Sequence, residues 1–473
     1  MSGLILLSIL GATTLISGVF QHRRLLLPLT LLGLVFTFLF VMGEWSGKAT
    51  YFADLIAPYN NGMLTFDSFA FAFSGLLLFF SLLVLSLSQF QVQEDVDHAG
   101  EYYSILLFTV LGAVVMVSFS NLVMLFIGIE ILSISLYVMA GSRKYTAPSN
   151  EASLKYFLLG SFASGFLLLG IALIYGTTGH LDLPGISSYI SANASSLPFL
   201  CILGIMMIIM GMAFKVSAAP FHNWSPDVYE GAPTVITAFM ATVVKTAAIA
   251  AFLRLMLGSF EAVQGWWTIL LSPISILTMT IGNVTALYQQ NFKRLLAYSG
   301  ISHAGYLLIG IVALTYDSPS YNSSGAILYY TAAYALATIA AFAVLLVVAG
   351  NSGDSSISAF NGLAKRDPKL AVALTICLLS LAGIPPLAGF FGKYYLFALA
   401  INKGLWVLAA FAILNSLIGI YYYFIVMINM FLKEKQDGLP STSSPASKVV
   451  IAICVILTII AGLFPEGVVQ VLK

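Results

Sequence analysis

The sequence predicts an all-α integral membrane protein with about 14 transmembrane helices. Of its 473 residues, 60% are hydrophobic and only 8% are charged, whereas about 25% of the residues in an ordinary soluble domain are charged. Apolar runs of roughly 20 residues, the length that crosses a bilayer as a helix, follow one another along almost the whole chain. Turn residues gather in the short segments between the runs. The chain is therefore predicted to cross a membrane many times.

The apolar runs and their breaks place the expected helices in order. The first run has no basic region before it, so we interpret it as a spanning helix and not as a cleaved signal. Only Ser120 and Asn121 separate the fourth run from the fifth, which suits an antiparallel pair. We expect helices at about residues 2–20, 25–43, 66–90, 102–119, 121–141, 153–176, 199–222, 233–257, 266–288, 294–316, 324–349, 369–401, 405–431 and 448–470.

Five ionisable residues lie well inside these runs and are expected to be buried, where charge is costly and usually marks a functional site. They are Glu130, Lys215, Lys245, His303 and Lys393. His222 lies near the end of the run at 199–222. A row of such groups at mid-membrane depth predicts a path for an ion or a proton.

Prolines interrupt two of the runs that carry a lysine. Pro220 lies near Lys215, and Pro385 and Pro386 precede Lys393. Proline removes a helical hydrogen bond and clashes with the preceding turn. We therefore expect broken helices at 199–222 and 369–401, with unwound backbone that protein or water must satisfy at membrane depth.

The two interrupted runs are five helices apart, which indicates an internal repeat. An odd number of helices per copy makes the two copies inverted, a plan that transporters use around a midplane site. We expect three N-terminal helices in 1–101, a first five-helix repeat in 102–257 and a second in 258–431. A cytoplasmic loop and the last helix occupy 432–473.

The basic residues predict the orientation, because cytoplasmic loops are enriched in Lys and Arg. An even number of spans puts both termini on one side. Of the twenty basic residues, thirteen fall in one set of loops, four in the other and three within helices. The thirteen include Arg23, Arg24 and Lys435, and the four are Lys48, Arg254, Lys403 and Lys473. This bias predicts that both termini lie on the non-cytoplasmic side.

Each buried residue also has a structural interpretation. Lys215, Lys245 and Lys393 could extend towards an interface along their apolar stems, although Lys245 lies deep within its run. Glu130 and Lys215 are expected to form an ion pair, because each group lowers the other's cost of burial. This pair could gate proton transfer, or it could only lock two helices together. His303 could be a packing residue, and His222 could cap a helix. The functional alternative is a proton relay, because lysine and histidine can take up and release protons whereas arginine stays charged.

Nothing in the sequence predicts a cofactor or a redox centre in this chain. Cys201, Cys377 and Cys454 stand alone in apolar runs and form no metal-ligand spacing. There is no phosphate-binding loop, no dinucleotide fingerprint and no basic block of the kind that binds nucleic acid.

Three motifs resemble one family. PFHNWSPDVYEGAPT with TAFMATVVKTAA, FKRLLAYSGISHAGYLL and LAGIPPLAGFFGKYYLF are similar to the antiporter-like membrane subunits of respiratory complex I. The motif VYEGAPT and the lysine at position 393 resemble those of the N-type subunit. Val235 follows APT where many relatives have proline. The resemblance extends over nearly the whole chain.

The resemblance implies a proton-pumping module of NADH:quinone oxidoreductase in a bacterial cytoplasmic membrane. In that family the matching residues form the channel axis: Glu130, Lys215, Lys245 and Lys393, with His303 as the link. NADH, FMN, iron–sulfur clusters and quinone would belong to the other membrane and peripheral subunits. A subunit of a cation/proton antiporter or of a membrane-bound hydrogenase remains an alternative, as does a structural spacer whose charges only fix helix packing.

Overall fold

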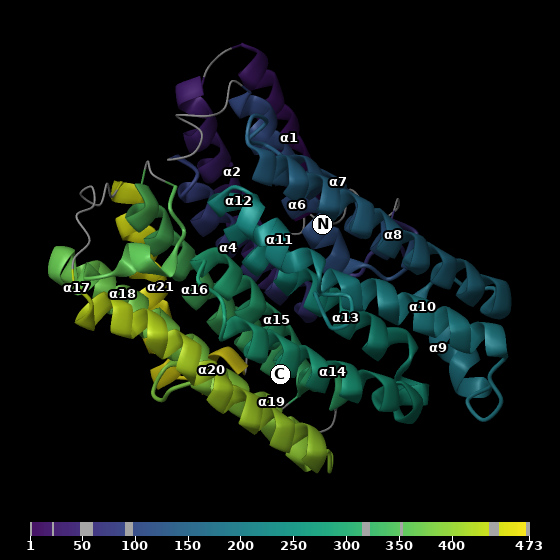
Figure 1. The fold of residues 1–473 in the computed structure, drawn as a ribbon. Coiled ribbons are helices and arrows are strands. Elements are labelled where there is room, and N and C mark those ends of the chain that lie inside the picture. Colours follow the sequence, from purple (N-terminus) through teal and green to yellow (C-terminus); the bar gives the residue numbers. More distant parts are fainter. Residues whose placement is uncertain are drawn as a thin grey trace. The chain divides into compact units, whose positions relative to one another are not determined.

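Helices make up every regular element in the described part of this computed structural model (Figure 1). The structure describes residues 2–20, 23–47, 60–89, 98–314, 322–350, 353–434 and 444–469. Within these ranges the only extended pairings are three isolated bridges. Twelve of the described helices are long and apolar enough to cross a membrane. Lys48, Lys435 and Lys473, which entered the charge count, lie outside the described residues.

The chain divides into two units, and the first comprises Met1–Leu85, Gln91–Ser217 and Val243–Leu270. In this unit α1 packs on α2 and α6, α6 on α7, and α8 along α10. Asn121 begins α7 by accepting a hydrogen bond from the backbone N–H of Val123, as N-cap residues do. Its helices are α1 (Ser2–Val19), α2 (Arg23–Trp45), α4 (Ser68–Ser86), α6 (Ala99–Ser118), α7 (Leu122–Ala140), α8 (Ala147–Thr178), α9 (Leu183–Ala192), α10 (Phe199–Lys215) and α13 (Lys245–Ser259).

The second unit comprises Ser86–Phe90, Ala218–Thr242 and Leu271–Lys473. Its centre is α16, which contacts α15, α18, α19 and α21 and is buried along most of its length. Its helices are α11 (Trp224–Gly231), α12 (Thr234–Phe239), most of α14 (Gln264–Ala286), α15 (Phe292–Val312), α16 (Ser323–Ala349), α17 (Leu363–Arg366), α18 (Pro368–Ala382), α19 (Ala388–Asn402), α20 (Trp406–Leu432), α21 (Pro445–Leu463) and α22 (Glu466–Val469).

Three of the predicted runs differ from the helices that form. The run at 199–222 contains α10, which ends at Lys215, and the run at 369–401 contains two helices, α18 and α19. The run at 233–257 contains a π-helical turn at Met240–Val244 between α12 and α13. The all-helical membrane architecture is confirmed, while α10 and α18 are shorter than the twelve long helices.

Close helix packing in the first unit depends on glycine. A Cβ atom on Gly112 would lie 2.8 Å from the carbonyl oxygen of Gly128 and 2.8 Å from the backbone nitrogen of Leu132. These are backbone atoms of the neighbouring helix, so they cannot move aside as a flexible side chain can. We expect Gly112→Val to separate α6 from α7 and to reduce the folded chain recovered from membranes severely, because overpacking a core costs about 1–3 kcal/mol.

The matched control for this substitution is Gly165→Val in α8, where a Cβ atom would meet nothing within 4 Å. Both changes place a β-branched residue within a helix, so their intrinsic effect on helix formation is the same. Size-exclusion chromatography of detergent extracts measures the folded fraction. Equal recovery of the two variants would contradict the packing argument.

Candidate functional site

Glu130 and Lys215 lie in the first unit, and a serine binds each of them. Lys215 is the last residue of α10 and is only 6% exposed. Its Nζ donates a hydrogen bond of 2.7 Å to Ser133 Oγ of α7, and the hydroxyl of Ser133 in turn donates to the carbonyl of Ile129. Glu130, half-buried on α7, accepts a hydrogen bond from Ser164 of α8. The carboxylate and the ammonium are thus both held by neutral hydroxyl groups.

The expected direct ion pair is not among the pairs found in the described residues. No nitrogen–oxygen contact within 4 Å joins Glu130 to Lys215 there. Instead, Ser133, Ser164 and Lys215 line a common cavity of about 10 Å³, a volume that accommodates about one water molecule. Gly160 and Gly211 form part of its wall, and a Cβ atom on Gly160 would clash with the hydroxyl of Tyr137, which also lines the cavity. A water molecule placed here would have polar partners on α7, α8 and α10, which is the setting that buried water requires.

Lys245 begins α13, directly after the π-helical turn, and is 3% exposed. The span from Thr234 to Ser259 that contains it is buried throughout its most apolar stretch. Single π turns of this kind within α-helices are frequent at functional sites. Extension of the Lys245 stem to the surface is thus excluded in this fold, because the ammonium lies inside the protein.

Lys393 of α19 lies against the end of α18. Its Nζ donates hydrogen bonds of 2.9 Å to the carbonyl oxygen of Ala382 and 2.9 Å to Ser416 Oγ, and the residue is 5% exposed. Gly383, which follows α18, has a φ of 84°, a conformation that favours glycine. A Cβ atom on Gly383 would lie 2.9 Å from Lys393 Cδ. Gly383 therefore both ends α18 and leaves room for the lysine.

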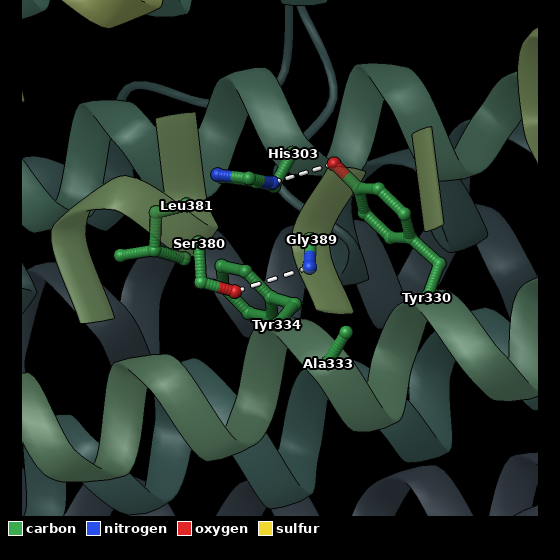
Figure 2. A pocket seen from close by; sticks show the side chains of 7 residues that line it. All are labelled: His303, Tyr330, Ala333, Tyr334, Ser380, Leu381 and Gly389. Carbon is green, nitrogen blue, oxygen red and sulfur yellow. Dashed lines mark hydrogen bonds between the residues drawn. The ribbon is translucent and has the colours of Figure 1, made fainter. Parts of the chain in front are cut away.

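His303 of α15 is held by two tyrosines. Its Nδ1 shares a hydrogen bond of 2.6 Å with the hydroxyl of Tyr330, and its Nε2 shares one of 3.3 Å with the hydroxyl of Tyr423. Figure 2 shows His303 and Tyr330 at a second cavity of about 10 Å³, which Tyr334 and Ser380 also line. With both ring nitrogens bonded to hydroxyl groups, the imidazole can bind a proton on one side and release one on the other.

The chain is similar to known proteins both in sequence and in fold. The family described as NADH:quinone oxidoreductase/Mrp antiporter, transmembrane region, matches residues 119–419. The chain is 42% identical to NADH-quinone oxidoreductase subunit N of Cytophaga hutchinsonii, covering 100% of this chain and 99% of that one. The chain belongs to the subunit N family. Subunit N of Flavobacterium psychrophilum is 40% identical over the full length of both chains.

A solved structure agrees with this assignment. A chain of the respiratory complex I of Thermus thermophilus with bound aureothin has a TM-score of 0.82 to this fold. It is 31% identical, and 99% of each chain is covered. The predicted resemblance to the N-type subunit is confirmed, and the chain is an antiporter-like, multi-pass membrane subunit of that family.

The segment between α10 and α11 carries the other residues expected to support the site. Pro220 and His222 lie in this segment, outside regular α-helix. The backbone N–H of Ala219 donates a hydrogen bond of 2.9 Å to Thr278 Oγ1 of α14. The peptide bonds before Pro220 and Pro386 are cis. His222 is half-buried, and its Nδ1 has no hydrogen-bond partner in the described structure.

Asp227 and Glu230 hold the short helix α11 in place. Arg294 of α15 donates hydrogen bonds of 2.8 Å to both carboxylates. Lys293, 6% exposed, donates to the carbonyls of Glu230 and Ala232 at 2.7 and 2.6 Å. Lysine at a helix C-terminus satisfies carbonyls that the helix leaves free. These contacts fasten the end of α11 to the start of α15.

Several residues of the site were not identified from the sequence. Ser133 follows Glu130 by three positions, so the two lie on the same face of α7, and this spacing could have identified Ser133. Ser164, Ser416, Tyr330 and Tyr423 reach the site through tertiary packing and carry no local signal. Within the described residues, no group of three or more His, Cys, Asp or Glu could hold a metal ion.

Proposed function

We propose that this chain moves protons across a bacterial cytoplasmic membrane as the N-type subunit of NADH-quinone oxidoreductase. Partner subunits would carry NADH, FMN, the iron–sulfur clusters and quinone. The observation that carries the proposal is the burial of Lys215, Lys245 and Lys393, which are 6%, 3% and 5% exposed within strongly apolar helices. Ionisable residues at such depth are rare, and their default interpretation is a functional site.

The partners of two lysines suit reversible protonation. Lys215 and Lys393 bind to hydroxyl and carbonyl oxygens, which accept a hydrogen bond from an ammonium and leave it free to lose its proton. A permanent ion pair would hold the proton more firmly. In the proposed order, a proton from the cytoplasmic side binds to Lys245, passes through His303 and leaves through Lys393.

The proposed gate is the set formed by Glu130, Ser133, Ser164 and Lys215. A change in the field of Glu130 would alter the proton affinity of Lys215 through the small cavity that the two serines share. Moving one charge against a potential of 100 mV takes about 2.3 kcal/mol. Small rearrangements of a charge in a low-dielectric interior supply energies of this size.

The proposed architecture treats α10 with α11 and α18 with α19 as two interrupted spans. The repeats would comprise 102–257 and 258–431, related by inversion, with three helices before them and one after. Carbonyl groups freed at the interruptions would face the protons, as Ala382 faces Lys393. Both termini would lie on the non-cytoplasmic side, as the distribution of Lys and Arg favours.

Replacing the deepest lysine tests the proposed function. We expect Lys245→Ala to reduce NADH-driven proton pumping by about tenfold or more, which corresponds to about 1.4 kcal/mol in barrier height. The measurement is the initial rate of acidification in proteoliposomes that contain the assembled complex. Lys403→Ala, on an exposed lysine that follows α19, is the control and should leave pumping unchanged. Normal pumping by Lys245→Ala would refute the relay.

A further inference from the structure

A pair of buried asparagines lies close to Lys393 and is not explained by the proposed relay. Asn283 of α14 is 1% exposed and Asn415 of α20 is 3% exposed. A side-chain amide inside an apolar bundle is costly unless its donors and acceptor are all bonded. The contacts of Asn283 indicate what it does.

Asn283 uses both of its polar atoms. Its Nδ2 donates to the hydroxyl of Tyr306 at 3.2 Å and to Asn415 Oδ1 at 3.4 Å. Its Oδ1 accepts a hydrogen bond of 3.1 Å from the hydroxyl of Tyr422. Asn415 is fixed in turn by a hydrogen bond of 3.1 Å to Thr280 Oγ1. The amide pair therefore joins α14 to α20 and holds the hydroxyl of Tyr306 in one position.

The ring of Tyr306 contacts two residues of the proposed relay. Lys393 Nζ lies 5.1 Å from the ring centroid, which is within the range of a cation–π interaction. The ring of His303 lies 5.9 Å away and at 72° to it. The electron-rich face of Tyr306 thus stabilises the charged form of Lys393 only while the ring keeps this orientation.

We propose that Asn283 is a positioning residue for Lys393 that acts through Tyr306. It touches neither the ammonium nor the imidazole. By fixing the phenol hydroxyl, it holds the aromatic face against Lys393 each time the lysine is protonated. Asn415 supports Asn283 and also precedes Ser416, the residue that accepts a hydrogen bond from Lys393. This inference deepens the proposed function and rests on it.

A double-mutant cycle in the assembled complex tests the proposal. Asn283→Leu and Tyr306→Phe should each lower the number of protons pumped per NADH oxidised by about threefold, as the weakening of one cation–π contact predicts. The double variant should be no worse than either single variant, because both changes remove the same hydrogen bond. Asn429→Leu, on a buried asparagine of α20 outside this cluster, is the control and should leave the ratio unchanged.

The outcomes separate this inference from the proposed function. The role of Asn283 would be overturned if the loss in the double variant equalled the product of the two single losses. It would also be overturned if Asn283→Leu left the number of protons pumped per NADH oxidised unchanged. If the complex with Asn283→Leu does not assemble, the Tyr306→Phe variant tests the inference in its place. Normal pumping by Tyr306→Phe would then overturn the inference. Lys393→Ala is measured in parallel. If Lys393→Ala loses pumping while Asn283→Leu pumps normally, only the inference about Asn283 is refuted. If Lys393→Ala pumps normally, the proposed function is refuted as well.

Discussion

Replacing Lys393 with arginine is expected to abolish NADH-driven proton pumping almost as completely as replacing it with alanine. Arginine keeps the positive charge and can donate to the same two oxygens, the carbonyl of Ala382 and the hydroxyl of Ser416. It does not release its proton under physiological conditions. If Lys393 carries the proton, both variants should pump about tenfold less or worse, a change of about 1.4 kcal/mol or more in the barrier.

The arginine variant distinguishes a proton carrier from a structural charge. A charge that only fixes helix packing would be served by either side chain, so Lys393→Arg would then pump normally while Lys393→Ala would assemble poorly. The measurement is the ratio of proton translocation to NADH oxidation in proteoliposomes, with assembly checked by native electrophoresis. Normal pumping by Lys393→Arg would contradict the proposed role.

The second large effect is expected at Lys215 and its hydroxyl partner. Lys215→Met removes the ammonium and should abolish pumping. Ser133→Ala keeps the ammonium but removes its hydrogen-bond acceptor, which leaves a buried charged donor unsatisfied at a cost of about 1.5–3 kcal/mol. We expect Ser133→Ala to lower pumping by about tenfold or more, because each ~1.4 kcal/mol of penalty changes a rate about tenfold.

Ser135 provides a matched control for Ser133. It lies on the same helix, and its hydroxyl likewise donates to the carbonyl four residues earlier, that of Ile131. The described contacts of Ser135 include no bond to a lysine. Ser135→Ala should therefore leave the rate of proton translocation unchanged in the same vesicle assay. Equal effects of the two serine variants would mean that helix packing, and not the ammonium of Lys215, accounts for the loss.

Hydropathy was sufficient to predict most of the membrane-length helices, because an apolar run of that length has few other ways to fold, although it merged α18 with α19 and extended α10 beyond Lys215. It also located Lys215, Lys245 and Lys393 correctly as buried residues, since a charge inside such a run is conspicuous. The sequence alone could not show whether Glu130 and Lys215 form a direct ion pair. Opposite charges two helices apart predict an ion pair, whereas side-chain packing in this fold places a serine beside each of them.

The remaining contacts of the site could not be predicted because they join residues far apart in the chain. Ser164 lies 34 positions from Glu130, and Tyr423 lies 120 positions from His303. Serine and tyrosine are common in apolar helices, so their identity alone does not mark them. The π-helical turn before Lys245 has no sequence signal either, since MATVV at 240–244 contains no proline or glycine.

Because of the π-helical turn at Met240–Val244, the direction of Lys245 depends on the number of residues in this segment as well as on their identity. Each residue of an α-helix advances the chain by about 100° around the axis, and a π turn accommodates one residue more than the regular winding would. Deleting one residue from the turn itself, such as Val243, would restore uniform winding and leave the direction of Lys245 almost unchanged, whereas deleting one residue from the regular helix before it, such as Ala238 of α12, would rotate Lys245 by about 100° about the axis of its own span. The side chain would then point to a different neighbour, although no amino acid beside it had been substituted.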